Sequence, residues 1–169
     1  PACSDCGYTA DNIREGSNLS LGTKLRGGEY VVGKVLGKPG GFGMTYLAWD
    51  SRLDIKVAIK EYLPFQIAAR SNDRTTVSVH TEAHTADFQF GLEKFLEEAK
   101  TLAQFRHPNI IRVLNYFQQN GTAYMVMDYL EGESLAEYLD RTGKLKGHDA
   151  VAILSPLLDG LAYVHSKNF

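Results

Sequence analysis

Two neighbouring features of the sequence could together hold a phosphorylated ligand. One is the glycine-dense turn Gly37-Lys38-Pro39-Gly40-Gly41-Phe42-Gly43, and the other is the lysine that ends Val57-Ala58-Ile59-Lys60. Backbone amides in a glycine turn can approach phosphate oxygens closely because no Cβ stands in the way. A lysine one strand later can contact the same phosphates as a point charge. Alone, a glycine cluster is usually a turn and such a lysine usually a surface residue, so the hypothesis depends on their order.

The surrounding hydrophobic pattern predicts the elements that position these residues. Strands are predicted at 30–36, 43–49 and 55–60, and the apolar residues of 88–105 recur at helical spacing. Two β-prone runs, 110–117 and 122–129, flank Gln119-Asn120-Gly121, which carries the Asn-Gly hairpin signal. The connector 61–87 is long, is broken by Pro64, and could add a short strand at 75–79.

Two further helices are predicted after residue 130. Ser134 can cap a helix that runs to about Asp140, because its hydroxyl can accept from first-turn amides. His148 or Asp149 opens the last helix. Its apolar residues form a face too wide for a helix lying on one small sheet; they are Val151, Ile153, Leu154, Leu157, Leu158, Leu161 and Val164.

Several motifs in fixed order give the chain its resemblance to a known family. The glycine turn, Val-Ala-Ile-Lys, Glu98-Ala99-Lys100-Thr101-Leu102, His107-Pro108-Asn109-Ile110 and Val126-Met127-Asp128-Tyr129 resemble the small lobe of a protein kinase. The segment Gly-Gly-Phe-Gly-x-Thr-Tyr-Leu-Ala (residues 40–48) is similar to the corresponding segment of bacterial serine/threonine kinases of the eukaryotic-like type. The resemblance covers residues 21–169.

The resemblance implies an α+β fold with three regions. Residues 1–20 would be a flexible tail, and residues 21–131 a kinase-like small lobe with an antiparallel five-stranded sheet and one main helix. Residues 132–169 would be the hinge exit and the first two helices of a truncated, helical large lobe. It implies the ATP-binding portion of an enzyme that transfers the ATP γ-phosphate to Ser/Thr hydroxyls of proteins.

The same resemblance assigns roles to individual residues. Lys60 would contact the α- and β-phosphates, and Glu98 would hold its ammonium in place, whereas Glu97 points elsewhere because one residue turns a helical side chain by about 100°. The ATP-site residues it implies are Leu36, Gly37, Gly40, Gly41, Phe42, Gly43, Thr45, Ala58, Lys60, Met127, Asp128, Tyr129 and Leu130.

Some positions depart from the family pattern. Lys38 stands where the first loop glycine belongs, and Pro39 removes a backbone donor, so the loop offers a phosphate fewer backbone amides than the family pattern does. Thr45 replaces the usual valine and brings a hydroxyl into an apolar roof.

The sequence contains no His-Arg-Asp, Asp-Phe-Gly or Ala-Pro-Glu, and it begins with Pro1. Both ends are therefore expected to be cuts, with the catalytic aspartate and the Mg²⁺ ligands beyond Phe169. Residues 1–169 alone are expected to be inactive. The alternative is a non-catalytic half-kinase or pseudokinase that binds nucleotide or a partner protein. A weaker third reading is a zinc scaffold on Cys3 and Cys6, the halves of one Cys-x-x-Cys.

Composition narrows the partners. Hydrophobic residues make up 44%, charged residues 22%, and the net charge is −2, which disfavours nucleic acid and anionic membrane as partners. No membrane span or signal peptide is recognisable, so a cytoplasmic location is expected. The expected partners are ATP and a protein with a Ser/Thr acceptor, and the last helix could mediate self-association.

Overall fold

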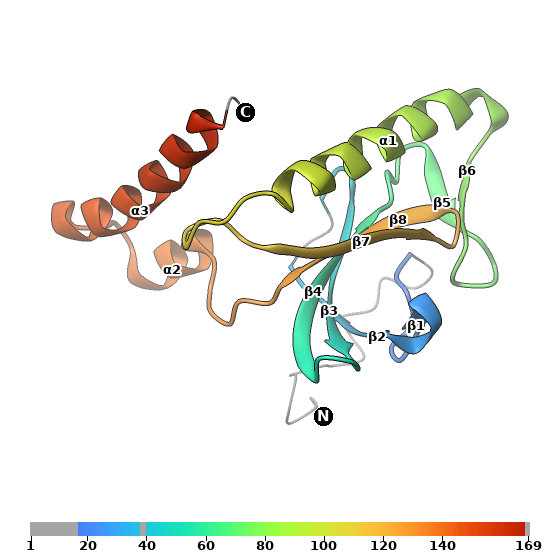
Figure 1. Cartoon of the computed structure of the whole chain (residues 1–169), viewed down its shortest axis with the longest axis horizontal. Coiled ribbons are helices and arrows are strands. Elements are labelled where there is room, and N and C mark those ends of the chain that lie inside the picture. Colours follow the sequence, from blue (N-terminus) through green and yellow to red (C-terminus); the bar gives the residue numbers. More distant parts are fainter. Residues whose placement is uncertain (1–16, 38–39, 168–169) are drawn as a thin grey trace. The chain divides into compact units, whose positions relative to one another are not determined.

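The structure is a computed structural model that describes residues 17–37 and 40–167 (Figure 1). The chain forms two units. The first contains the described residues up to Ala103 together with 113–129, and the second contains 104–112 together with the described residues from Leu130 onward. Every strand among the described residues belongs to the first unit.

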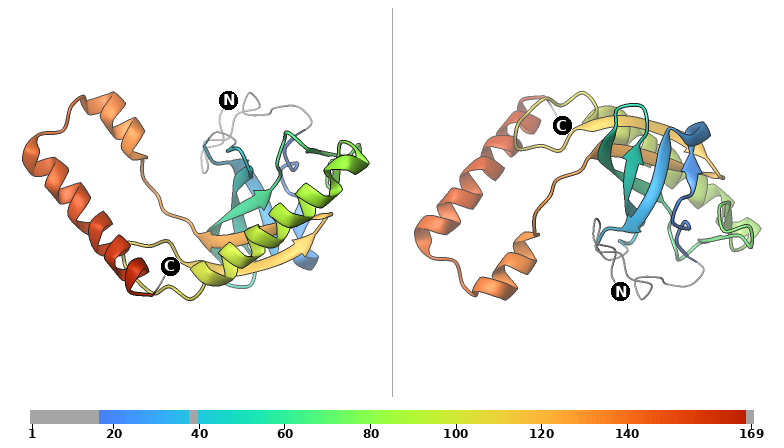
Figure 2. Two further views of the ribbon diagram at one scale, coloured as in Figure 1. Left: turned by 90° about the horizontal axis from the view of Figure 1, so that it is seen from above. Right: turned by 90° about the horizontal axis from the view of Figure 1, so that it is seen from below.

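A six-stranded antiparallel sheet is the centre of the first unit (Figure 2). Its strand order is β1 (Lys24–Leu25), β2 (Tyr30–Val35), β3 (Gly43–Asp50), β4 (Ile55–Tyr62), β8 (Thr122–Asp128) and β7 (Val113–Gln119). The antiparallel sheet is confirmed, but the expected number of five strands was wrong. The additional strand is β1, which pairs with β2 through two residues only. Two residues are too few for a hydrophobic alternation to be visible in the sequence.

The sheet buries apolar side chains on both faces. Because successive strand residues point to opposite faces, β4 sends Val57 and Ile59 to one face and Ala58 and Lys60 to the other. The first face is closed by the chain's early residues, including Leu19 and Leu25, which lie in the same cluster as Val57 and Ile59. The second face carries the helix α1 and is called the α1 face below.

The helix α1 (Thr85–Leu102) packs on β7 and β8. Its buried residues are Phe88, Leu92, Phe95 and Ala99, at the spacing that places side chains on one helix face. The predicted range 88–105 was three residues late at both ends. The helix begins directly after the 3-10 turn η3 (Glu82–His84), and it ends where the Ala103 amide turns back to the Ala99 carbonyl.

The turn between β7 and β8 confirms the Asn-Gly prediction. Asn120 and Gly121 have φ angles of 56° and 71°, the positive values that a two-residue hairpin turn matching the strand twist requires. A Cβ on Gly121 would lie 2.5 Å from the Val77 carbonyl oxygen, because the connector packs against this turn.

The connector between β4 and α1 forms a small sheet of its own. Its strands are β5 (Ala68–Arg70) and β6 (Val77–Val79), paired antiparallel. The strand expected at 75–79 is thus present, and β5 is the partner that periodicity did not indicate. The Val77 amide donates to the Asn120 carbonyl at 2.8 Å, which fastens the small sheet to the β7–β8 hairpin.

The second unit contains α2 (Leu135–Thr142) and α3 (Gly147–Ser166). The predicted cap is confirmed: the Ser134 hydroxyl accepts from the Glu137 amide, and the Glu137 carboxylate accepts from the Ser134 amide, a complete capping box. Helix α3 begins one residue before His148. Within this unit the His107 ring lies 5.1 Å from the Tyr163 ring and its Nε2 is 3.2 Å from Asp159 Oδ2.

Candidate functional site

Lys60 lies near the end of β4, on the α1 face of the sheet. Its cross-strand partners are Thr45 on β3 and Met125 on β8. Directly opposed residues of antiparallel strands share a face, so these side chains and that of Ala58 line one surface. The predicted lysine and the predicted threonine of the ATP site are therefore neighbours.

Helix α1 brings Glu98 to Lys60. The Lys60 Nζ lies 3.8 Å from Glu98 Oε1 and 5.7 Å from the centre of the Phe95 ring. Glu97 instead lies 2.7 Å from Lys94 on the outer surface of the helix. The Lys60 and Glu98 side chains are 35% and 49% exposed, so water screens the pair and its contribution to stability is small. The arrangement orients an ammonium that remains accessible to an anionic ligand.

The described part of the glycine turn is a tight reversal between β2 and β3. Gly40 and Gly43 exchange two backbone hydrogen bonds, at 3.0 and 3.4 Å, and Phe42 at the tip is exposed. Gly43 has a φ of 154°, and a Cβ there would lie 1.8 Å from the Glu61 carbonyl oxygen. Glycine at 43 is therefore required by the close approach of β4. Lys38 and Pro39 lie outside the described residues.

Ala58 is a small residue on the same face of the sheet as Lys60. Ala58 stands between Leu47 on β3 and Met127 on β8 in the register of the sheet. The Leu36 amide donates to the Thr45 carbonyl at 2.7 Å, which fixes the exit of β2 beside this surface. Asp128 ends β8 opposite Val57, Tyr129 follows in the first unit, and Leu130 belongs to the second unit.

A cavity of about 450 Å³ opens beside the ion pair. Phe42, Lys60 and Glu98 line it together, so the turn tip, the lysine and the glutamate share one space. The remaining walls come from β4, the connector and α1; they are Tyr62, Pro64, Gln66, Ile67, Asp87, Phe90, Gly91, Lys94 and Phe95. An anion inside the cavity could reach the Lys60 ammonium. Among these additional residues, Gly91 carried a signal in the sequence as a glycine inside a helical pattern.

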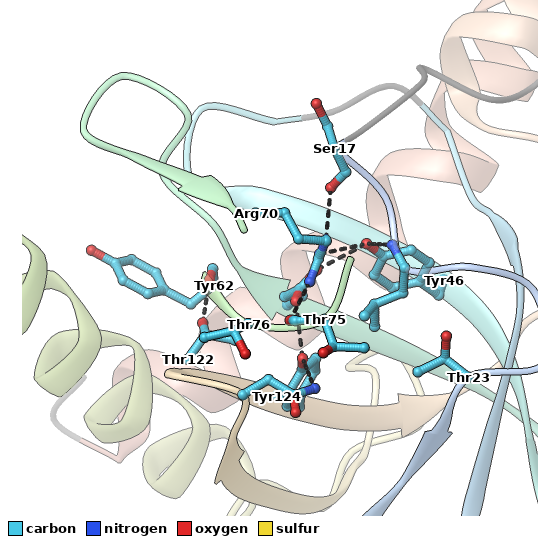
Figure 3. A network of polar contacts seen from close by, with 12 residues as sticks. Ser17, Thr23, Tyr46, Tyr62, Arg70, Thr75, Thr76, Thr122 and Tyr124 are labelled. Atoms are coloured by element: carbon cyan, nitrogen blue, oxygen red, sulfur yellow. Dashed lines mark hydrogen bonds and ion pairs between the residues drawn. The ribbon is translucent and has the colours of Figure 1, made fainter. Parts of the chain in front are cut away.

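Sequence reasoning missed a buried ionic cluster on the opposite face, next to Lys60 in the sequence. Arg70 Nη2 lies 2.5 Å from Glu61 Oε2, and both side chains are 0% exposed. The Tyr46 hydroxyl donates to the same carboxylate at 2.8 Å and the Tyr124 hydroxyl at 3.0 Å. Figure 3 shows Arg70 between Tyr46 and Tyr124, with its guanidinium also donating to the Thr75 and Ser17 carbonyls. We call Glu61, Arg70, Tyr46 and Tyr124 the Glu61 cluster.

The electrostatics of the Glu61 cluster follow from burial. Desolvation and then the Glu61 charge raise the pKa of the Tyr46 hydroxyl far above its usual value. The same two causes raise the pKa of Tyr124. For Arg70, desolvation lowers the pKa, but the Glu61 charge and hydrogen bond outweigh it, so the pKa is raised. Arg70 is thus a fixed cation that joins β5 to the middle of the sheet.

Two other expectations concern metals and membranes. Among residues 17–37 and 40–167, no three His, Cys, Asp or Glu side chains are grouped closely enough to hold a metal ion. Cys3 and Cys6 lie outside the described residues. No helix in the described part of the chain combines the length and hydropathy of a membrane span.

Comparison with known proteins shows similarity to protein kinases. A family model described as protein kinase domain matches residues 30–169. The chain is 31% identical over 149 residues to the serine/threonine-protein kinase PrkC of Bacillus subtilis, covering 88% of this chain and 20% of that protein. It is 28% identical over 157 residues to the probable serine/threonine-protein kinase PknB of Bifidobacterium longum, again covering 88% and 20%.

Solved structures agree in fold. The apo form of PpkA-294 matches with a TM-score of 0.69 and 35% identity, over 75% of this chain and 43% of that one. The PknI kinase domain of Mycobacterium tuberculosis matches with a TM-score of 0.64 and 23% identity, over 89% and 52%, which supports the fold alone. The chain thus spans about a fifth of these curated relatives and about half of these solved chains.

Proposed function

The chain belongs to the protein kinase family, and on that premise we propose that it is the ATP-binding portion of a serine/threonine protein kinase. The relatives named as serine/threonine-protein kinases support this class of enzyme. We propose that these residues bind the nucleotide and that the enzyme transfers the γ-phosphate to a protein hydroxyl.

The Lys60–Glu98 pair is the observation that carries the proposal. Two charged groups far apart in the sequence, on β4 and α1, meet at 3.8 Å in a space that the tip of the glycine turn also lines. A lysine on a flexible stem binds phosphate best when an anion restricts its position. In the neighbouring Lys94–Glu97 pair only Lys94 lines the cavity, and its partner Glu97 lies outside it.

Each residue at the site has a proposed task. Bound ATP supplies the phosphoryl group that a kinase transfers. Lys60 provides the positive charge for the α- and β-phosphates, and Glu98 orients it. The backbone of 40–43 approaches the phosphates, Ala58 and Met127 enclose the adenine, and the Asp128 and Leu130 backbone binds its edge. The remaining proposed ATP-site residues, Leu36, Gly37, Thr45 and Tyr129, complete the enclosure.

Nucleotide titration of the 169-residue chain tests the proposal. A fluorescent ATP analogue should bind saturably and be displaced by unlabelled ATP. Lys60→Met should weaken binding by about tenfold or more, the loss expected for a charge-assisted contact. Lys56→Met removes an exposed lysine from the same strand and should leave binding unchanged. Absence of binding, or equal losses in the two variants, would overturn the proposal.

Phosphate transfer is a separate question. Because residues 1–169 contain no His-Arg-Asp or Asp-Phe-Gly, we expect the chain alone to bind nucleotide without transferring phosphate. Incubation with radiolabelled ATP, Mg²⁺ and a basic acceptor protein should give no label above a blank. Label that disappears in Lys60→Met would contradict this expectation. The non-catalytic module reading predicts the same blank, and extension of the chain through a catalytic loop separates the two, because only a kinase gains activity.

The partners follow from the same proposal. They are ATP, with Mg²⁺ bound by groups other than these residues, and a protein that presents a Ser or Thr hydroxyl. Self-association through α3 is proposed from its exposed apolar side chains and is tested in the Discussion.

A further inference from the structure

Gly91 lies in the interior of α1, where glycine is among the poorest helix formers. Its missing side chain opens a notch in the surface of the helix. A Cβ at this position would lie 2.2 Å from the Tyr62 hydroxyl oxygen and 3.0 Å from Tyr62 Cζ. The notch therefore admits the end of the Tyr62 ring, and α1 can approach β4 closely.

Tyr62 is held in the notch from several directions. Its hydroxyl donates to the Phe88 carbonyl oxygen at 3.2 Å, and its ring lies 5.2 Å from the Phe88 ring and 5.8 Å from the Phe95 ring. Its own carbonyl accepts from the Thr122 hydroxyl on β8, a contact visible in Figure 3. The residue is 3% exposed. The ring also borders the cavity, but its hydrogen bond to Phe88, its two ring contacts and the Thr122 contact all oppose a shift of Tyr62 away from α1.

The notch and the ion pair are successive contacts between the same two elements. Tyr62 and Lys60 are two residues apart on β4 and share a face. Gly91, Phe95 and Glu98 are separated by four and three residues on α1 and so lie on one stripe. Tyr62 meets α1 at Gly91, and Lys60 meets it at Phe95 and Glu98. The distance between β4 and α1 at the Tyr62–Gly91 contact therefore affects the distance between the two elements at the Lys60–Glu98 contact.

We propose that Gly91 and Tyr62 are positioning residues for the Lys60–Glu98 pair. The seating of the Tyr62 ring in the Gly91 notch fixes how closely α1 approaches β4, and this holds Glu98 within reach of the Lys60 ammonium. This rests on the proposed nucleotide-binding function of Lys60 for its consequence. Its geometric part can be measured without nucleotide.

The expected displacement is large enough to matter. Ordinary contact between a Cβ and an oxygen begins near 3.4 Å, so a methyl group at residue 91 requires a movement of about 1 Å. Because contacts with Phe88, Phe95 and the sheet hold the Tyr62 ring in place, we expect α1 to supply that movement. The Lys60 Nζ–Glu98 Oε1 distance is already 3.8 Å, so a further separation of about 1 Å would break the ion pair. Misplacement by about 1 Å at a site of this kind reduces function by up to about 100-fold.

Zero-length crosslinking of the full chain tests the geometric part. A carbodiimide joins a lysine amine and a glutamate carboxylate as an amide with loss of water, only where the groups touch. The unsubstituted chain should give a Lys60–Glu98 crosslink, mapped by mass spectrometry, and Gly91→Ala should reduce its yield about tenfold. The Lys94–Glu97 crosslink, within α1 at 2.7 Å, is the internal control and should be unchanged. An unchanged Lys60–Glu98 yield would overturn the proposal.

Nucleotide affinity tests the consequence. Gly91→Ala should weaken binding of the fluorescent ATP analogue about tenfold, and adding Glu98→Gln to Gly91→Ala should cause little further loss, because the pair is already separated. If Gly91 only stabilises the fold, Glu98→Gln should weaken nucleotide binding by the same factor in the Gly91→Ala chain as in the unsubstituted chain. That result would overturn the proposal. If the unsubstituted chain binds no nucleotide, the proposed function fails, while the crosslink still decides the positioning.

Matched variants separate positioning from general damage. Gly147→Ala makes the same exchange at the start of α3, where nothing lies within 4 Å of the added Cβ, and it should change neither readout. Tyr62→Phe removes the oxygen nearest the new methyl group, so Gly91→Ala/Tyr62→Phe should regain part of the crosslink. Should Gly91→Ala fail to fold, Tyr62→Leu empties the notch from the strand side and must lower the same yield for the proposal to stand.

Discussion

Arg70 of β5 and Glu61 of β4 form an ion pair at 2.5 Å in which neither side chain is exposed to solvent. Two tyrosine hydroxyls and two backbone carbonyls satisfy the remaining bonds of the pair. Burial of a charge is costly unless it is paired and hydrogen-bonded, so the pair fixes where the 61–87 connector meets the sheet. Through Arg70 the connector is thus anchored to the face of the sheet opposite to Lys60.

Removing one partner of this pair should destabilise the fold strongly. Arg70→Met leaves the Glu61 carboxylate buried without its cation, and we expect a loss of about 3–5 kcal/mol in the free energy of unfolding. Glu61→Gln combined with Arg70→Met should cost clearly less than the sum of the single changes, because the double variant leaves no unpaired charge at this buried position. Urea denaturation measures all three. Lys94→Met, which breaks the exposed Lys94–Glu97 pair, is the control, and additive losses would show that Glu61 and Arg70 are not coupled.

Stability should fall in alkaline solution because of the buried tyrosines. Tyr46 and Tyr124 have raised pKa values in the folded chain, whereas their ordinary value is 10.0. Below pH 10 the tyrosines are protonated in both the folded and the unfolded chain, so they do not make the free energy of unfolding depend on pH. Above pH 10 only the unfolded state releases them, so each can lower the free energy of unfolding by up to about 1.4 kcal/mol per pH unit.

Denaturation curves between pH 8 and 11.5 check this alkaline effect. Tyr46→Phe should be less stable at pH 8, since its hydrogen bond to Glu61 is lost, but its stability should decline less steeply above pH 10. Equal slopes for the variant and the unsubstituted chain would show that Tyr46 is not a source of the decline.

Glu98 and Glu97 should differ sharply in a kinase domain that carries a catalytic loop after these residues. We expect Lys60→Met and Glu98→Ala each to reduce turnover by about 100-fold or more, and the double variant to lose little beyond either, because the two groups act as a unit. Glu97→Ala should be mild, since Glu97 pairs with Lys94 on the outer surface of α1. Phosphate incorporation into an acceptor protein measures these rates. A severe Glu97→Ala with a mild Glu98→Ala would reverse the assignment.

The last helix should make the chain self-associate through residues 149–166, or remain frayed. Its exposed apolar residues are Val151, Leu154, Leu157, Leu158 and Leu161, between 44% and 63% exposed. Covering such side chains gains roughly 1.5–3 kcal/mol each at full burial. Sedimentation velocity over a concentration series should show association that Leu158→Glu reduces and Ala152→Glu, on another side of the helix, does not. A monomeric chain whose α3 amides are strongly protected from hydrogen exchange would contradict the prediction.

Local sequence determined much of this protein. The Asn120-Gly121 turn, the Ser134 cap and the strands that flank the glycine turn were predictable, because each depends on the backbone preference or side-chain reach of residues close together in the chain. The choice of Glu98 over Glu97 came from the family resemblance, and the structure places Glu98 at Lys60. The motif order likewise indicated the kinase fold that the comparisons confirm.

Other features arise only when distant segments meet. The strand β1 is two residues long, and it exists because β2 offers an unpaired edge. Nothing near Glu61 in sequence indicates that Arg70 will neutralise it, since burial is a property of the packed lobe. Gly91 appears in the sequence as a weak point in a helix, and only the position of the Tyr62 ring shows that the missing Cβ lets α1 approach β4. The sequence by itself determined which residues could do the chemistry; the tertiary structure decided how far apart they are held, because that separation is set by the side chains packed between the elements.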